Sequence, residues 1–362
     1  SDNVVSCIVE DNAKNLWIGT NGGGLNFYDS ASKTYKYYLQ NSDLSKEVSF
    51  KDIKAVYVDE LHDNIYVGTH AGGMIVLNRR TGNQRFFNTQ NSDLPSNNIY
   101  SILSDGHGGL WIASLGTLIH YDIAGNHFQT VDKDSKGKRL QESNSVLFRD
   151  SKKRIWAGGE MGLTIYNQTG TSLTINTEYD IAPILKQSFI NCFCESTSGY
   201  IWVGTRNGLF GLKENAKELL QYTTVDGLPS NVSYGRLWIS TNQGLSCLTP
   251  GSRKLRNFTI VDGLQSNQFN AGSYCRINNG NMLFGGINGI TSFRPETLID
   301  NPYSPRPFIN KLYVSNKEVL PGDETRILKK CIENEDHITL TSSQNSFSIS
   351  FVVSNYIAGK HN

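Results

Sequence analysis

The amino-acid sequence predicts an all-β protein: a seven-bladed β-propeller over residues 1–295, followed by a partial β-sandwich. Three observations support this fold class. A short motif with a central aromatic residue recurs along the first 295 residues, and it returns at a spacing near 45 residues. A proline-bracketed segment then leads into strands of a different pattern. A repeat of about this length is typical of one propeller blade, which needs four short strands and their turns.

All five tryptophans of the chain stand at the second position of one five-residue pattern, such as Leu16-Trp17-Ile18-Gly19-Thr20 or Ile201-Trp202-Val203-Gly204-Thr205. Two further copies keep the frame with another residue at that position. The seven blades are therefore expected around Trp17, Tyr66, Trp111, Trp156, Trp202, Trp238 and Leu283. Because nearly the same residue recurs in blade after blade, we expect it to pack between neighbouring sheets, whereas a binding residue should differ between blades.

The residues around each aromatic position predict four strands per blade. A short apolar strand ending in an acidic or polar turn precedes it, as in residues 99–105, and a glycine turn with a third strand follows, as in 208–212. The fourth strand alternates aromatic and polar residues, as at 35–38, which is expected of an outer edge. Only 36 residues separate Trp202 from Trp238. We therefore expect a segment to be missing near Ser233, because loss of an inner strand would leave backbone groups unpaired.

Composition limits the possible functions. The chain has 34 Lys and Arg against 33 Asp and Glu, a net charge of +1, so no general field attracts nucleic acid or an anionic membrane. No apolar run approaches the roughly 18 residues of a membrane span, so we expect this chain to be soluble. The six cysteines form no CxxC pair and are interpreted as small buried hydrophobes, with a pairing of Cys247 and Cys275 left open.

The full repeat runs from a Leu-Pro-Ser-Asn linker, as at residues 94–97, through a strand, an Asp, a Gly and the Trp motif to Gly-Leu. It closely resembles the two-component regulator propeller repeat over residues 1 to about 295. In that family such repeats form the periplasmic sensor region of hybrid two-component histidine kinases, typically as two propellers, a small β-sandwich, a membrane helix and cytoplasmic kinase modules. The resemblance implies that this chain is the second propeller and the start of the tyrosine-rich sandwich, in the periplasmic portion of an inner-membrane protein.

The last part of the chain divides into a linker, residues 296–307, and the start of the sandwich, residues 308–362. The linker contains Tyr303-Ser304-Pro305-Arg306-Pro307. Alternating strands follow at 308–314 and 347–351. We expect this sandwich to be incomplete, since the later strands of the family's domain are absent and half a sandwich would expose its sheet edges.

The positions that vary within the constant repeat indicate where a ligand would bind. In a propeller, the turn between the second and third strands opens on one face around the central channel. After the Gly-Thr pair the seven copies read Asn21, His70, Leu115, Glu160, Arg206, Asn242 and Ile287. The candidate ligand-binding residues are Asn21, His70, Glu160, Arg206 and Asn242, which suit a sugar's hydroxyls and one carboxylate or sulfate on Arg206. The alternative is that they are ordinary solvated turn residues.

No catalytic constellation is present in the sequence. The seven histidines lack metal-ligand spacing, there is no nucleophile elbow, and the Gly22-Gly23-Gly24 run enters a strand rather than a helix. We therefore expect no catalytic residue, metal or cofactor in this chain. The Asp and Gly before each tryptophan are expected to hold a turn, as in the Asp-box hairpin of sialidases. One alternative is a propeller lyase or glycosidase with carboxylates over the channel, such as Asp2, Asp43, Glu160 and Asp226; another is a protein-interaction scaffold.

The preferred interpretation is a sensor that recognises an oligosaccharide or polysaccharide breakdown product and signals across the membrane to regulate transcription. The expected partners are the oligosaccharide, an upstream propeller and a second copy of the chain joined through the sandwich. Direct contact with nucleic acid is not expected, and membrane contact would come only through other segments. Histidine kinase activity would belong to the full-length protein, and the sequence does not name the ligand.

Overall fold

The computed structural model describes residues 2–39, 50–140, 145–177, 181–214, 219–223, 237–249, 254–298 and 307–353. The chain divides into two compact units, Ser1–Pro295 and Glu296–Asn362. Within the described ranges, no helix is long and apolar enough to cross a membrane. The described ranges contain the single-turn helix α1 (Pro183–Lys186) and the 3-10 turns η2 (Ile260–Asp262), η3 (Pro295–Thr297) and η4 (Ile332–Asn334).

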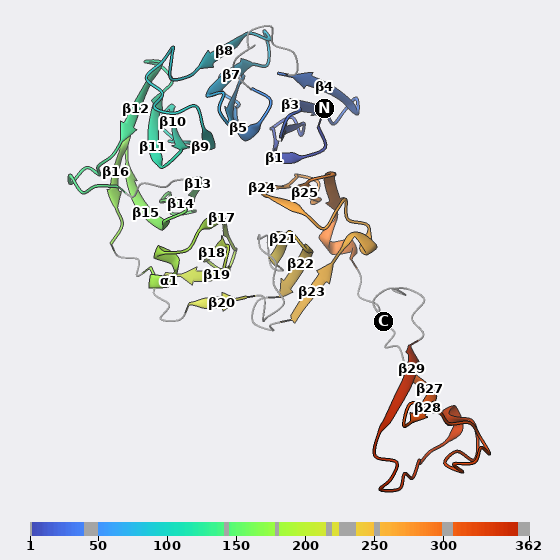
Figure 1. The fold of residues 1–362 in the computed structure, drawn as a ribbon. Helices are drawn as coiled ribbons and strands as arrows, with labels where there is room; N and C mark the ends of the chain where they lie inside the picture. The colour runs from blue at the N-terminus through green and yellow to red at the C-terminus, as the bar shows by residue number, and fades with distance from the viewer. Residues whose placement is uncertain are drawn as a thin grey trace. The chain divides into compact units, whose positions relative to one another are not determined.

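The first unit is a β-propeller, whose sheets form a ring in Figure 1. Five sheets have four antiparallel strands, each strand hydrogen-bonded to the next in sequence. Blade one contains β1 (Val5–Glu10), β2 (Leu16–Thr20), β3 (Leu25–Asp29) and β4 (Thr34–Tyr38). Blade two contains β5 (Ile53–Asp59), β6 (Asn64–Thr69), β7 (Met74–Asn78) and β8 (Gln84–Phe87). Blade three contains β9 (Ile99–Ser104), β10 (Gly109–Ser114), β11 (Thr117–Asp122) and β12 (His127–Val131).

Blades four to seven continue the ring. Blade four contains β13 (Val146–Arg149), β14 (Ile155–Gly159), β15 (Gly162–Thr169) and β16 (Ser172–Ile175). Blade five contains β17 (Ile190–Glu195), β18 (Tyr200–Thr205), β19 (Gly208–Lys213) and β20 (Leu220–Tyr222). The described strands of blade six are β21 (Leu237–Thr241), β22 (Gly244–Thr249) and β23 (Lys254–Phe258), and those of blade seven are β24 (Phe269–Arg276), β25 (Met282–Gly286) and β26 (Gly289–Phe293). The segment predicted to be missing near Ser233 lies outside the described residues.

The ring closes where blade seven meets blade one. The amide of Gly289 donates to the carbonyl of Asn3 at 2.8 Å, and the side-chain amide of Asn270 donates to the carbonyl of Val5 at 2.7 Å. An apolar cluster between the two blades adds Ile8, Ile18 and Leu283 to Val5. The first and last blades are therefore joined by polar and apolar contacts of the same kinds that join other blades.

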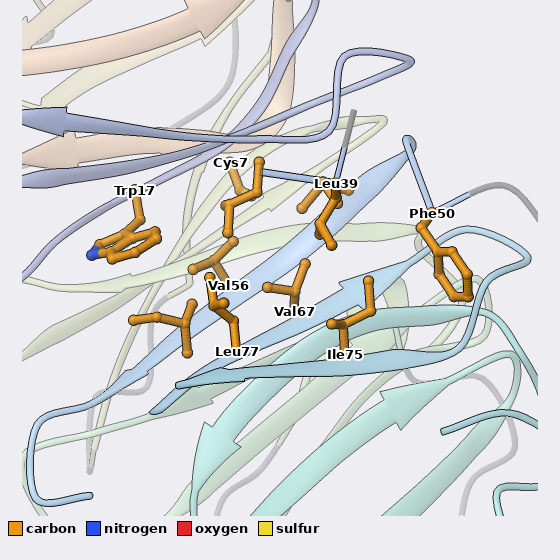
Figure 2. Close-up of a cluster of buried hydrophobic side chains, with 11 residues drawn as sticks. Cys7, Trp17, Leu39, Phe50, Val56, Val67, Ile75 and Leu77 are labelled. Carbon is orange, nitrogen blue, oxygen red and sulfur yellow. The ribbon is translucent and has the colours of Figure 1, made fainter. Parts of the chain in front are cut away.

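The recurrent aromatic residue packs between blades, as predicted. Trp17 lies in a cluster with Ile53, Val67 and Leu77 of the next blade (Figure 2). Tyr66, Trp111, Trp156 and Trp202 each belong to the corresponding cluster between their own blade and the following one. None of these five side chains is more than 1% exposed. An aromatic side chain that buries about 200 Å² gains on the order of 5 kcal/mol by transfer from water, so this one position contributes strongly to every interface.

The aspartate before the aromatic residue holds the turn between the first two strands. In blade one, Asp11 accepts hydrogen bonds from the Asn15 amide at 2.8 Å and from the Trp17 indole nitrogen at 3.2 Å. Asp150 of blade four makes the equivalent bonds to Arg154 and Trp156. These carboxylates are buried and fully engaged, so the interpretation of this aspartate as a structural residue is confirmed.

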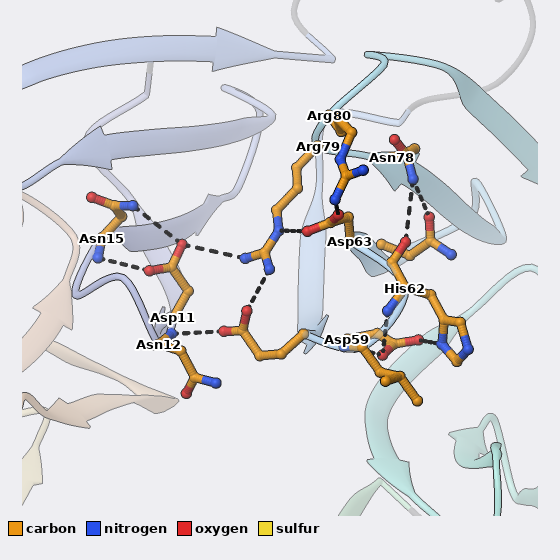
Figure 3. A network of polar contacts seen from close by, with 12 residues as sticks. Asp11, Asn12, Asn15, Asp59, His62, Asp63, Asn78, Arg79 and Arg80 are labelled. Carbon is orange, nitrogen blue, oxygen red and sulfur yellow. Dashed lines mark hydrogen bonds and ion pairs between the residues drawn. The ribbon is translucent and has the colours of Figure 1, made fainter.

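An ion-pair network that includes Asp11 joins blades one and two (Figure 3). The Arg79 guanidinium contacts Glu60, Asp63 at 3.1 Å and Asp11 of the neighbouring blade at 3.7 Å. Burial alone would lower the pKa of Arg79, but hydrogen bonds to Glu60 and Asp63 raise it above the usual value. The buried Asp11 therefore supports its own hairpin and also an interface between blades.

The second unit contains a three-stranded antiparallel sheet in the order β28 (Lys317–Glu318), β27 (Pro307–Val314), β29 (Phe347–Val353). Its core is formed by Leu312, Val314, Val319, Leu328 and Ile332. The assignment of this unit to an incomplete β-sandwich remains a prediction.

All six cysteines are free thiols, so Cys247 and Cys275 are not bonded to each other. Cys7, Cys192 and Cys247 are buried, as expected of small hydrophobes. Cys331 is exposed, and the expectation of burial is wrong there because this residue precedes η4 at the surface of the second unit.

Replacing Asp11 by alanine should lower the free energy of unfolding by about 2 kcal/mol or more, because the Trp17 indole and the Asn15 amide lose their acceptor and Arg79 loses a carboxylate. Urea titration followed by tryptophan fluorescence measures the change. Asp93→Ala is the matched control: its carboxylate is 72% exposed and its ion pair with His127 should contribute less than about 1 kcal/mol. Equal effects of the two substitutions would contradict this account.

Candidate functional site

The inner strands of four blades carry a β-bulge at the same place. The register shifts between Val5 and Cys7 on β1, and corresponding shifts occur on β5, β9 and β17. The extra residues are Ser6, Lys54, Tyr100 and Asn191. Blade seven has a longer irregularity between Phe269 and Tyr274, which includes Asn270. A bulge redirects a side chain out of the regular alternation of the strand; we call Ser6, Lys54, Tyr100, Asn191 and Asn270 the bulge ring.

The residue before each bulge is held by a glycine of the preceding blade. A β-carbon on Gly19 would lie 2.6 Å from Cγ2 of Ile53, and one on Gly68 would lie 2.5 Å from Cγ2 of Ile99. The same contact is made by Ile190 against Gly158 and by Val5 against Gly285. These distances leave no room for a side chain. The glycine of the Trp-x-Gly motif therefore fixes the start of the next inner strand, and the following residue is directed into the channel.

A cavity of about 550 Å³ occupies one end of the central channel, and every member of the bulge ring lines it. Inner-strand residues of blades one to five and seven contribute to its wall. Lys54 is the one charged residue among its described lining residues. The remaining polar lining groups are hydroxyls, side-chain amides and backbone, beside apolar side chains. This mixture suits a ligand that offers both hydroxyl groups and an apolar face.

Some of these polar residues are tied to neighbouring blades. The Ser6 hydroxyl donates to the carbonyl of Ile53 at 2.6 Å, and Asn270 bonds Val5 as described above. The ammonium of Lys54 donates to Oδ1 of Asn21 in blade one at 2.9 Å. The cavity wall is thus built from side chains whose positions depend on the contact of one blade with the next.

Three aromatic residues are shared by this cavity and a neighbouring one. Phe148, Phe193 and Tyr274 line both this cavity and a second cavity of about 750 Å³, which also reaches exposed turn residues of blades four and five such as Ser151 and Thr197. The rings of Phe148 and Phe193 are 6.2 Å apart, and the Tyr274 hydroxyl donates to the Phe193 carbonyl at 3.2 Å. Burial raises the pKa of Tyr274, so its hydroxyl remains a neutral donor.

Of the five residues predicted from the turns, Asn21 lines this cavity, and His70, Glu160 and Arg206 each act on a residue that lines it. His70 has its ring 6.5 Å from that of Tyr100, and burial together with the charge of Glu160 raises the pKa of Tyr100. The guanidinium of Arg206 lies 3.8 Å from the ring centre of Phe189, another lining residue. Asn242 is exposed on the turn between β21 and β22 and is not among the described lining residues. The role of these five residues in binding remains a prediction.

Sequence reasoning missed the bulge ring, although a signal was present. One variable residue stands between a branched apolar residue and a small residue in Val5-Ser6-Cys7, Ile53-Lys54-Ala55 and Ile190-Asn191-Cys192. The criterion that a binding residue should differ between blades applies to this position at least as well as to the turns.

The carboxylates considered for an enzyme are only partly described. Asp43 and Asp226 lie outside the described residues. Asp2 accepts a hydrogen bond from the amide of Val4 at 2.8 Å and so caps its own loop. Among the residues that the structure describes, no group of three His, Cys, Asp or Glu side chains is placed to hold a metal ion.

Comparison with known proteins defines the class. The two component regulator propeller family model matches residues 1–22, 93–116 and 184–207, which confirms the resemblance drawn from the repeat. The chain is thus a β-propeller in which three segments match the two-component regulator propeller repeat.

Three individual proteins are informative. Histidine kinase P4 of Formosa agariphila is 26% identical over all of this chain and 27% of its own length. The extracellular domain of a putative hybrid two-component system from B. thetaiotaomicron has a TM-score of 0.69 at 24% identity, covering 98% of this chain and 47% of that one. A streptogramin B lyase has a TM-score of 0.61 at 14% identity, covering 80% of this chain and 93% of the lyase. The chain spans about a quarter of the curated relative, and the two solved structures show likeness of fold.

Replacing Gly68 by alanine should destabilise the propeller by about 1–3 kcal/mol, because the added methyl group overlaps Ile99 and the backbone has to shift. Thermal unfolding measures the change. The double variant Gly68→Ala/Ile99→Ala lacks the Cγ2 atom that the new methyl group would overlap. Its loss of unfolding free energy should therefore be smaller than the sum of the losses of the two single variants. Strict additivity would show that this contact does not determine the spacing of the two blades.

Proposed function

We propose that this chain is the extracellular ligand-sensing region of a hybrid two-component histidine kinase and that it binds an oligosaccharide in the cavity lined by the bulge ring. The observation that carries the proposal is the bulge ring itself, a set of variable polar residues presented by a constant scaffold of regulator repeats. Kinase activity and the membrane anchor would belong to other parts of a longer, inner-membrane protein with this region in the periplasm.

The chemistry of the cavity supports a sugar ligand. Tyr100 offers an aromatic face for the apolar side of a pyranose ring, and Asn191 and Asn270 offer amides that both donate and accept hydrogen bonds. Phe148, Phe193 and Tyr274 add further aromatic surface where this cavity adjoins the second one. We expect a ligand to enter from the face that carries Asn21 and to present one of its ends to the cavity.

Signalling requires that the ligand bind one state of the receptor more tightly than another. We propose that this difference passes through the second unit to a membrane helix and alters the geometry of a homodimer, with an upstream propeller as a further partner. Ligand contacts that compete with bonds between blades, such as the one from Asn270 to Val5, would provide such a difference.

The proposal is tested by calorimetric titration of the chain with neutral, uronic and sulfated oligosaccharides, alone and joined to its upstream partner. Saturable binding without chemical change supports the sensor. Turnover of a bound sugar would instead indicate a propeller lyase or glycosidase, and absence of binding in both forms would favour a protein-interaction scaffold.

Replacing Tyr100 by alanine should weaken the binding of an oligosaccharide about tenfold, because the ligand loses an aromatic surface of the cavity wall. The dissociation constant from calorimetry is the measurement. Tyr35→Ala is the matched control, because that side chain is 54% exposed on the outer strand β4 and should leave affinity unchanged. The reverse pattern would move the site from the channel to the outer edge of blade one.

A further inference from the structure

We propose that Lys54 selects an acidic sugar unit, a uronic acid or a sulfated sugar, by binding its anionic group inside the central cavity. This inference rests on the proposed function and names the class of ligand for the same site. It differs from the expectation drawn from the turns, in which Arg206 was the residue for such a group.

The position of Lys54 supports this role. Its bulge on β5 follows Ile53, which is fixed against Gly19 of blade one, so the base of the lysine side chain is held in place. The side chain is half-buried and lines the cavity. A charge in a partly enclosed site interacts more strongly with an opposite charge than one on an open surface, because less water screens it.

The partner of the ammonium is neutral. Among the described residues, the Lys54 ammonium donates a hydrogen bond to the side-chain oxygen of Asn21. An ammonium has three N–H donors, so this bond orients the group and leaves donors for a ligand. Because Asn21 carries no charge, it does not neutralise the lysine.

Three other charged residues near the cavity lie outside its described lining. Arg206 is stacked on Phe189 of blade five, and burial together with the charge of Glu160 raises the pKa of Tyr100. Asp2 caps its own loop beside Gly22. Because Lys54 is the one charged residue among the described lining residues, the acidic group is placed at its ammonium, with the sugar ring extending toward Tyr100.

The test compares two probes that differ in charge, trigalacturonate and the neutral galactotriose, together with a 6-sulfated chondroitin disaccharide. Each is titrated by calorimetry into the chain, into Lys54→Gln and into Lys51→Gln. Lys51 is the matched control, since it is exposed, lies three residues earlier and is not among the described lining residues. Thermal unfolding of both variants establishes that they fold.

At least one acidic probe should bind the chain and Lys51→Gln equally, and Lys54→Gln should bind it at least about tenfold more weakly, the effect of one charge-assisted hydrogen bond. Affinity should fall with added salt in the chain and much less in Lys54→Gln. If the neutral probe binds as well as the acidic ones, or if Lys54→Gln binds an acidic probe normally, the inference is wrong while the sensor proposal stands. If neither acidic probe binds, the inference is contradicted, and the sensor proposal is then decided by the wider panel titrated into the chain alone and joined to its upstream partner.

Discussion

The arrangement of the propeller depends on the contact between a bare glycine α-carbon on the second strand of one blade and a branched side chain at the start of the next inner strand. At Gly19 and Gly68 the neighbouring isoleucine methyl group occupies the space where a β-carbon would be. The buried aromatic residue two positions earlier fills the rest of the interface. Because the glycine fixes where each inner strand begins, it also fixes which residue follows into the channel. The scaffold and the cavity are therefore consequences of one contact.

Blade four keeps the position of the ring although the residue on its preceding blade differs. Blade three carries Ala113 where Gly19, Gly68 and Gly158 stand in their blades. The amide of Ser145 donates to the carbonyl of Gly158 at 2.7 Å, and Val146 pairs with the same glycine, as Cys7 pairs with Gly19 in blade one. Ser145 also lines the cavity. Blade four therefore contributes the residue at this position to the cavity wall as well.

The sequence was sufficient to predict the repeat, the number of blades and the burial of the aromatic residues, because each depends on a period that can be counted along the chain. Burial at Trp111 and Trp156 follows directly from their recurrence. The bulge ring could not be located in this way. A bulge is defined by an unequal number of residues on two paired strands, and Lys54 is recognised as the extra residue only when Ile53 and Ala55 are aligned with Thr69 and Gly68. The variable turns, by contrast, can be located from the sequence without knowledge of the register.

This division between constant and variable positions explains how one scaffold can present different cavity surfaces. The residues before the bulge are constrained by the glycine of the preceding blade, and those after it, such as Cys7 and Ala55, pair with the glycine of their own blade across the hairpin. The bulge residue lies outside the regular ladder of its own sheet, so its side chain is serine, lysine, tyrosine or asparagine in different blades. Substitution there alters the chemistry of the cavity and at most a side-chain bond to the next blade, such as that of Ser6 to Ile53, whereas substitution one position earlier disturbs the packing of two blades. A propeller of this kind can therefore change its ligand through the bulge ring while its fold is maintained.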